Sequence, residues 1–295
     1  MHWILSVSET FSLKNVLLSS RWLLLPPFSA NAALERLYRV ERLETGHTVA
    51  LTFSETPAGL IIHSNQRLVG KETEEISHKT WRMLRLSENL QPFHEQAQRH
   101  NALIPLAQTG ARLLRGANFF EDVIKGLLLT WKTEAWGAEQ IHWLVDRFGD
   151  PLPTNPTRHA FPTPEQFLWN EHLLREMPAP ALALQLIKVA ESFLLQAETI
   201  QRAIQPELPT GEVVATLQNL LALDARALGF VMFSLGRYDH IPDSDGAATD
   251  DRAALPPIAD IRESFPDWSR WGGLICWLRY GIAQAHSPVL LQSEV

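Results

Sequence analysis

The stretch that decides the fold is LLALDARALGFVMFSLGRYDHIPDSD, residues 220–245. Asp224 stands directly before an apolar run that ends at Leu235, which is the pattern of a helix N-cap residue followed by its helix. Gly236 then closes the run as a C-terminal glycine. Another helix is expected just before, over residues 212–222. The stretch therefore predicts a helix, a tight turn, a second helix and then a loop rich in carboxylates.

The chain on either side of this stretch is mostly helical by its apolar spacing. Apolar residues recur three and four positions apart over residues 120–128 and 141–148, and Gly149 follows the second run as a C-cap. A proline-rich connection is expected over residues 149–164. Further helices are expected over residues 164–175, 181–204 and, rich in aromatic side chains, 268–282.

The N-terminal part differs, because apolar and polar residues alternate there. Residues 47–54 place Val49, Leu51 and Phe53 on one face, as in a half-buried strand. A turn signal starts at Thr56 and β-prone residues follow, so a hairpin is expected. Residues 34–43 fit either a helix or a strand. We therefore predict an α+β, mainly α protein with a small antiparallel sheet domain over residues 1–100 and a helical domain over residues 101–295.

Composition limits the classes of protein that the chain can be. Hydrophobic residues make up 45% of the 295 residues and charged residues 20%, as in globular proteins. The single cysteine, Cys276, excludes an internal disulfide and a four-cysteine metal site, and it favours a reducing compartment. No apolar run approaches the roughly 20 residues of a membrane helix, and the first residues lack a signal-peptide pattern. A soluble, cytoplasmic protein is expected.

Charge and motifs narrow the chemistry further. The formal net charge of -7 argues mildly against indiscriminate nucleic-acid binding, which needs a basic surface. The sequence has no glycine-rich phosphate loop, no His-Glu-x-x-His and no Gly-x-Ser-x-Gly. The eleven histidines show no metal-ligand spacing. We therefore expect neither a metal ion nor a cofactor.

Residues 220–245 resemble the helix-hairpin-helix DNA glycosylases of base excision repair, in the branch of alkyladenine and 8-oxoguanine glycosylases. In that family the hairpin reads approximately Leu-Pro-Gly-Val-Gly-Pro. A segment like Leu-Gly-Arg-Tyr-Asp then leads to Pro-Val-Asp-Ser, whose Asp is the catalytic carboxylate. Four further segments resemble the family in the same order along the chain. They are RLLRGANFFEDVIKGLL (112–128), WGAEQ (136–140), HAFPTPE (159–165) and WGGLICW (271–277).

This resemblance implies a fold, a reaction and a partner. The helical domain would have two lobes with a cleft between them, and the hairpin would lie near residues 212–236. The activity implied is that of an N-glycosylase that flips an alkylated or oxidised purine out of double-stranded DNA. A carboxylate would stabilise the sugar cation as the glycosidic bond breaks. We expect a monomer that works in the cytoplasm and associates with a bacterial nucleoid when it is on DNA.

The resemblance places the catalytic carboxylate at one of two aspartates. An alignment without gaps puts Ser244 at the catalytic position. Deleting one loop residue puts Asp243 there, and inserting one puts Asp245 there. The alternative for both aspartates is a solvated acidic loop with a helix N-cap.

The resemblance also places the contacts with the DNA backbone at the hairpin. The two hairpin glycines of the family correspond to Ala222 and Asp224, and its Schiff-base lysine corresponds to Arg226. Arginine stays protonated and cannot act as an amine nucleophile, so an active enzyme would be monofunctional. Arg226 is a candidate phosphate contact or a plain surface arginine. Asp224 is also explained as a simple N-cap.

A second group of candidates follows the first long helix. Thr133 matches an asparagine that faces the duplex in many relatives, and Lys132 lies beside it. Trp131 and Trp136 are candidates for the base pocket, with core packing as the alternative. Lys125 and Lys132 also fit solvated positions on a helix.

Two features of the sequence leave a second function open. The hairpin glycines of the family are absent, and the aspartate is displaced from its expected position. The alternative hypothesis is therefore a catalytically inactive relative that serves as a DNA-binding or structural module. Arg112 and Arg115 could face either DNA or solvent.

Overall fold

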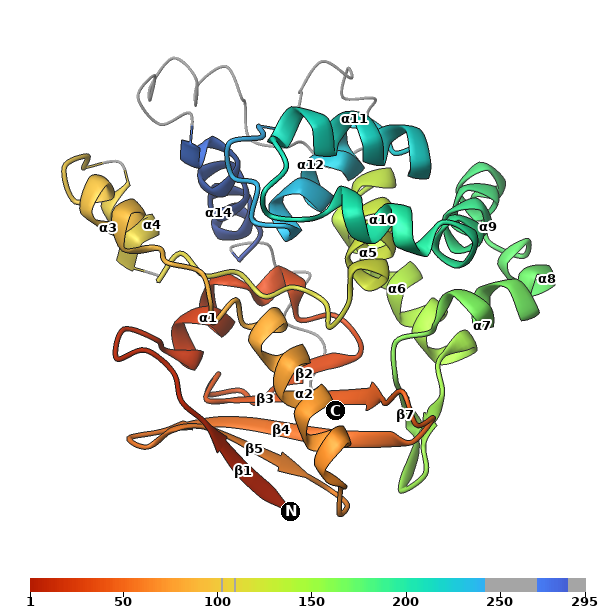
Figure 1. Cartoon of the computed structure of the whole chain (residues 1–295), viewed down its shortest axis with the longest axis horizontal. Coiled ribbons are helices and arrows are strands. Elements are labelled where there is room, and N and C mark those ends of the chain that lie inside the picture. The colour runs from red at the N-terminus through yellow and green to blue at the C-terminus, as the bar shows by residue number, and fades with distance from the viewer. Residues whose placement is uncertain (102, 109, 242–269, 286–295) are drawn as a thin grey trace. The chain divides into compact units, whose positions relative to one another are not determined.

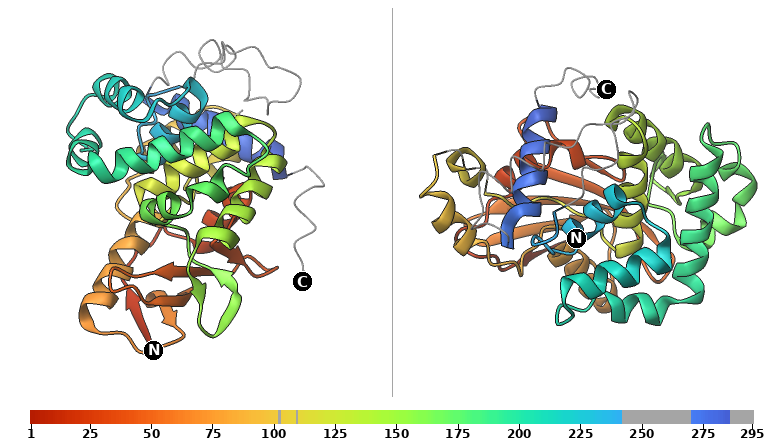
Figure 2. Two further views of the ribbon diagram at one scale, coloured as in Figure 1. Left: turned by 90° about the vertical axis from the view of Figure 1, so that its right-hand side faces the viewer. Right: turned by 90° about the horizontal axis from the view of Figure 1, so that it is seen from above.

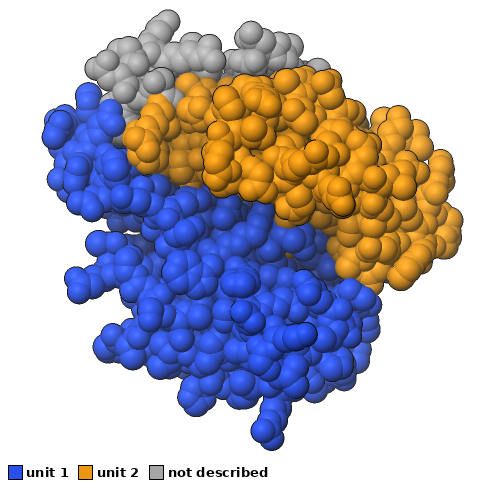
Figure 3. Space-filling model, viewed as in Figure 1, with its two compact units in different colours: residues 1–118, 145–161, 278–295 blue, residues 119–144, 162–277 orange. Residues whose placement is uncertain are grey.

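The computed structural model describes residues 1–101, 103–108, 110–241 and 270–285. The chain divides into two compact units, which Figure 3 shows in different colours. Unit 1 holds residues 1–118, 145–161 and 278–295, and unit 2 holds residues 119–144 and 162–277. The division falls within two helices, α6 (Glu134–Phe148) and α14 (Gly272–Ala285). The domain boundary near residue 100 stays a prediction.

Unit 1 contains a five-stranded antiparallel sheet in the order β1-β5-β4-β3-β2 (Figure 1). The hairpin expected from the alternating residues is formed by β4 and β5, and the ambiguous residues 34–43 contain β3. Gly59 at the hairpin turn has φ +129°, and a Cβ there would lie 2.4 Å from the carbonyl oxygen of Leu5. The strands are β1 (His2–Leu5), β2 (Phe28–Ala30), β3 (Arg36–Arg42), β4 (Thr48–Thr56) and β5 (Gly59–Ser64).

One face of this sheet is the core of unit 1. Leu37, Phe53 and Ile62 are paired in register across β3, β4 and β5, and all three are fully buried. The helix α2 (Gly70–Met83) crosses the sheet in Figure 1. The indole Nε1 of Trp3 donates a hydrogen bond to Ser77 Oγ of α2 at 3.0 Å. The alternation expected for β4 is therefore confirmed, because its apolar positions face a covered surface.

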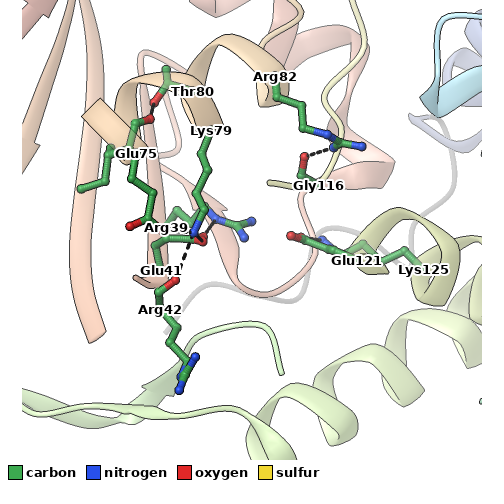
Figure 4. A network of polar contacts seen from close by, with 11 residues as sticks. Arg39, Glu41, Arg42, Glu75, Lys79, Thr80, Arg82, Gly116, Glu121 and Lys125 are labelled. Carbon is green, nitrogen blue, oxygen red and sulfur yellow. Dashed lines mark hydrogen bonds and ion pairs between the residues drawn. The ribbon is translucent and has the colours of Figure 1, made fainter. Parts of the chain in front are cut away.

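A buried ionic network ties α2 to the sheet (Figure 4). Arg39 Nε donates to Glu41 Oε2 at 2.5 Å, and Lys79 Nζ donates to Glu41 Oε1 at 2.7 Å and to Glu75 Oε1 at 2.6 Å. The Arg39 guanidinium lies 4.4 Å from the ring centroid of Phe28. Burial opposes the charge of Lys79, but the two carboxylates raise its pKa above the ordinary value. Lys79 therefore remains protonated at neutral pH.

The expected proline-rich connection contains a second, two-stranded sheet of β6 (Pro151–Leu152) and β7 (Asn155–His159). Leu152 and Ala160 pack with Val40 of β3 in a small apolar cluster. Gly149 follows α6 as expected, but its φ is not positive, so it is not a left-handed cap. A Cβ at Gly149 would lie 2.0 Å from the carbonyl oxygen of Ala160, and this close approach explains the glycine. Unit 1 also contains α1 (Leu13–Ser19), a 3₁₀ turn η1 (Arg21–Leu23), α3 (Gln91–Ala97) and α4 (Ile104–Gln108).

Unit 2 is helical in the part that the structure describes. The prediction of one continuous helix over residues 164–175 and another over 181–204 was wrong in one respect. The first is interrupted at Asn170 and the second at Gln196. Neither position is a glycine or a proline, so the sequence carries no breaker signal there. The helices are α5 (Phe119–Trp131), α7 (Pro164–Trp169), α8 (Glu171–Leu174), α9 (Pro180–Leu195), α10 (Ala197–Ala203), α11 (Thr210–Leu221) and α12 (Ala225–Ser234).

The centre of unit 2 is the packing of α12 on α5. Gly126 of α5 lets the ring of Phe230 approach so closely that a Cβ would lie 2.9 Å from its Cδ1. Phe230 also meets Trp277 of α14 edge-on, with ring centroids 5.4 Å apart. Near the start of α5, the Phe120 ring contacts Phe167 and Phe193. The predicted α+β, mainly α class is confirmed. Within the described ranges, no helix is both long and apolar enough to cross a membrane.

Candidate nucleic-acid interface

The residues 212–236 form the predicted helix–turn–helix hairpin, in which α11 and α12 lie next to each other (Figure 1 and Figure 2). The helix α11 ends at Leu221, and Ala222 takes the left-handed conformation with φ 50° and ψ 39°. Asp224 is the N-cap of α12, and its carboxylate Oδ1 accepts a hydrogen bond from the Ala227 N–H at 2.9 Å. The predicted N-cap is therefore confirmed, and Gly236 with φ +78° follows the helix as expected.

Two side chains of α9 hold the turn of the hairpin. Gln185 Nε2 donates to the Ala222 carbonyl oxygen at 2.9 Å. Ser192 Oγ donates to the Leu220 carbonyl oxygen at 3.1 Å. The last carbonyl groups of a helix have no partner within the helix, so these bonds stabilise the end of α11. The turn is thus supported by α9, not by a glycine at its left-handed position.

The charge of the hairpin is unusual for a surface that contacts phosphate. Asp224 and Glu212 are exposed, whereas the only cation in residues 210–234 is Arg226. Arg226 is 7% exposed, and its side chain is engaged in contacts within the protein. A hairpin of this kind presents negative charge and no exposed cation. Phosphate binding here would therefore rest on main-chain N–H groups.

The turn between α5 and α6 gathers the second group of predicted residues. Trp131 ends α5, and Thr133 precedes α6 with its Oγ1 accepting from the Trp136 N–H at 3.2 Å. Lys132 Nζ lies 5.3 Å from the centroid of the Trp136 ring, a cation–π contact. Both tryptophans and Lys132 are half-buried, and Thr133 is exposed. The structure therefore brings two aromatic rings and one cation to a single helix–turn–helix tip.

The helix α5 carries a buried ion pair. Lys125 was predicted as a candidate for a solvated position, but its side chain is 6% exposed and pairs with fully buried Glu121 at 2.9 Å. The signal that was missed is a Glu and a Lys four residues apart on a helix whose other residues are mostly apolar. The Lys125 ammonium group is therefore held inside the protein by the Glu121 carboxylate and is not available at the surface.

The arginines near residue 112 bind backbone carbonyl groups. Arg112 donates to the carbonyl oxygens of Arg85 and Glu88, and Arg115 Nε donates to that of Arg82 at 2.7 Å. Arg82 in turn donates to the carbonyl oxygen of Gly116 (Figure 4). These contacts attach residues 112–116 to the end of α2. Arg112 and Arg115 are both half-buried, so each has a structural role while part of its side chain stays accessible.

The two candidate catalytic residues, Asp243 and Asp245, lie outside the described residues. Side-chain hydrogen bonds fix the chain just before them, at Arg237 and Asp239. Arg237 donates to the carbonyl oxygens of Leu208 at 2.7 Å and Gln205 at 2.6 Å. Asp239 accepts from Thr210 Oγ1 at 2.9 Å. Among the described residues, no group of three or more His, Cys, Asp and Glu side chains could hold a metal ion.

Comparison with known proteins places this arrangement in a structural class. No family model matches the sequence, and no curated protein matches it. The fold matches a 3-methyladenine DNA-glycosylase from Archaeoglobus fulgidus with a TM-score of 0.69 and 17% identity, over 98% of this chain and 99% of that one. It also matches the apo form of the Clostridium acetobutylicum 8-oxoguanine glycosylase/lyase, with a TM-score of 0.67 and 14% identity over 95% of both chains.

A third match is the same Clostridium enzyme in complex with double-stranded DNA containing cytosine opposite 8-oxoguanine. Its TM-score is 0.60 at 16% identity, over 96% of this chain and 98% of that one. The class that these matches define is the helix-hairpin-helix DNA glycosylase fold. The chain has this fold along almost its whole length, which confirms the fold that the sequence resemblance implied.

Proposed function

We propose that this protein is a DNA N-glycosylase that removes an alkylated or oxidised purine from double-stranded DNA. The observation that carries the proposal is the fold match over 98% of the chain, together with a hairpin at residues 212–236 where the sequence resemblance expects it. The reaction would proceed by flipping the damaged base and cleaving its glycosidic bond. The enzyme would act in the cytoplasm, at the nucleoid.

The catalytic carboxylate in this proposal is Asp243 or Asp245. Either would stabilise the cation that develops on the sugar as the bond breaks, and it would orient the attacking water. The anchoring of Arg237 and Asp239 fixes the chain a few residues before these aspartates, which supports the proposal. Arg226 occupies the position of the Schiff-base lysine, so the proposed enzyme has no lyase step.

The α5–α6 tip fits contact with an unpaired base in the same proposal. Trp131 and Trp136 offer aromatic faces for stacking, and Lys132 adds a positive charge next to Trp136. Thr133 is exposed and offers a hydroxyl group to the DNA. At the hairpin, Ala222 and the backbone around Asp224 would approach a phosphate through N–H groups.

The test is a single-turnover excision assay on duplexes that carry a panel of alkylated, oxidised and deaminated bases. Asp243→Asn and Asp245→Asn are compared with Asp239→Asn, an aspartate that the proposal leaves out of catalysis. We expect one of the first two to lose excision by about 100-fold or more, because it removes a stabilising charge from the transition state. Asp239→Asn should stay within a few-fold of the wild type, because the asparagine Oδ1 can still accept the hydrogen bond from Thr210 Oγ1. Absence of excision for every base in the panel contradicts the proposal.

A second candidate function is supported by a specific observation at the hairpin. The Asp224 carboxylate caps α12 at the position of a family glycine, and like charges repel between a carboxylate and a phosphate. An inactive relative that serves as a DNA-binding or structural module fits this feature. Salt-dependent binding of duplex DNA without excision of any base would support this candidate.

A further inference from the structure

The helix α9 carries an exposed stripe on the side away from the core of unit 2. Leu184, Lys188, Glu191 and Leu195 recur at spacings of four, three and four residues, so they share one helix face. Leu184 is 45% exposed and Leu195 is 83% exposed. The opposite face of α9 is buried and consists of Leu182, Ala183, Leu186, Ile187, Val189 and Ala190. Figure 1 shows α9 at one side of the helices of unit 2.

The stripe is symmetric about its own centre. The midpoint between Lys188 and Glu191 and the midpoint between Leu184 and Leu195 both fall between residues 189 and 190. A two-fold axis through that point relates two antiparallel copies of α9. Leu184 of one copy then meets Leu195 of the other, and Lys188 meets Glu191. Both ends of the contact are apolar, and both central pairs join opposite charges.

The charges of the stripe are available for such pairing. Both Lys188 and Glu191 are exposed, and within the described part of the chain neither makes an ion pair. An isologous contact uses each residue twice, so one Lys and one Glu give two intermolecular pairs. The order Leu, Lys, Glu, Leu along this face is thus complementary to itself when two copies run antiparallel.

We propose that this face of α9 binds a second copy of the chain as an antiparallel, two-fold symmetric helix pair. The proposal is independent of the proposed glycosylase activity, and it replaces the monomer expected from the sequence. One helix face on each copy forms a small interface, so the association should be weak. We expect a dissociation constant of the order of 10 µM.

The first experiment measures the mass of the full chain by sedimentation at protein concentrations from well below to well above that dissociation constant. The wild type should pass from monomer to dimer as concentration rises. Lys188→Glu and Glu191→Lys should each remain monomeric, because each creates two like-charge pairs across the axis. Leu195→Ser should also remain monomeric. A wild type that stays monomeric throughout overturns the proposal.

The second experiment combines the two charge variants. An equimolar mixture of Lys188→Glu and Glu191→Lys should form a heterodimer, because all the charge pairs across the axis are then opposite in sign. The double variant Lys188→Glu with Glu191→Lys should form a homodimer again. Glu212→Lys on α11 makes the same charge change off the stripe and should dimerise like the wild type. Failure of the mixture to dimerise, or dimerisation of either charge variant alone, overturns the antiparallel contact.

Discussion

At the scale of single residues, Ala222 is the most informative position of the hairpin. It holds a left-handed conformation with φ 50°, which costs a non-glycine residue about 1 kcal/mol or more because its Cβ crowds the backbone. We expect Ala222→Gly to raise the free energy of unfolding by about 0.5 to 1 kcal/mol, since part of the gain is offset by the entropy of the unfolded glycine. Denaturant titration followed by circular dichroism measures this change.

The matched control is the same substitution in the adjacent helix. Ala215 is exposed in α11, where a glycine lowers stability by about 1 kcal/mol. Ala215→Gly and Ala222→Gly should therefore change stability in opposite directions. A loss of similar size in both variants would show that the left-handed conformation of Ala222 is not a source of strain.

The structural role of a residue was predictable from the sequence where that role depends only on its immediate neighbours along the chain. Asp224 as an N-cap follows from a short polar side chain before an apolar run. The buried pair of Lys125 and Glu121 left only a weak signal, the spacing of four residues on a mostly apolar helix, because burial depends on which helices pack around α5. The position of Arg226 within the protein has the same origin, since its burial is set by tertiary packing and not by its place at the start of α12.

At the scale of elements, the close packing of α12 on α5 depends on Gly126. A Cβ at this position would lie 2.9 Å from Cδ1 and 3.4 Å from Cγ of Phe230, and these atoms move only if the ring or the helix shifts. We expect Gly126→Ala to lower the free energy of unfolding by about 1 to 3 kcal/mol, because overpacking outweighs the gain in helix propensity. Thermal or denaturant unfolding provides the measurement.

Gly211 in the first turn of α11 provides the comparison. A Cβ there meets nothing within 4 Å. Gly211→Ala should leave stability unchanged or raise it by up to about 1 kcal/mol, because alanine favours the helix. If Gly126→Ala is as well tolerated as Gly211→Ala, the close contact of α5 with Phe230 is not what requires a glycine.

The elements were predictable where their periodicity is long and regular. The β4–β5 hairpin and helices α5, α6, α11 and α12 follow from the spacing of apolar residues. The β6–β7 hairpin was hidden, because its strands are two and five residues long and contain prolines. The breaks at Asn170 and Gln196 were hidden because neither residue is a strong helix breaker.

At the scale of the whole molecule, the formal net charge of -7 affects how strongly the protein binds DNA and how that binding depends on salt. A protein that releases many counterions from DNA binds with a steep dependence on salt. The hairpin presents exposed Asp224 and Glu212 and buries its only cation, so it neutralises few phosphates. We expect the binding of undamaged duplex to be weak and its salt dependence to be shallow, consistent with one or two phosphate contacts.

The proposed phosphate contact at the hairpin makes Asp224→Asn the decisive variant at this scale. Asparagine caps a helix as well as aspartate does, so α12 should keep its N-terminus and the protein its stability. Loss of the carboxylate removes about 1 kcal/mol of repulsion from a nearby phosphate, which corresponds to about fivefold tighter duplex binding at low salt. The gain should shrink as salt rises. Fluorescence anisotropy with a labelled duplex measures both, and Glu176→Gln, an exposed charge outside the hairpin, serves as the control. Equal changes for the two variants would mean that only net charge matters, and that the hairpin does not approach the DNA backbone.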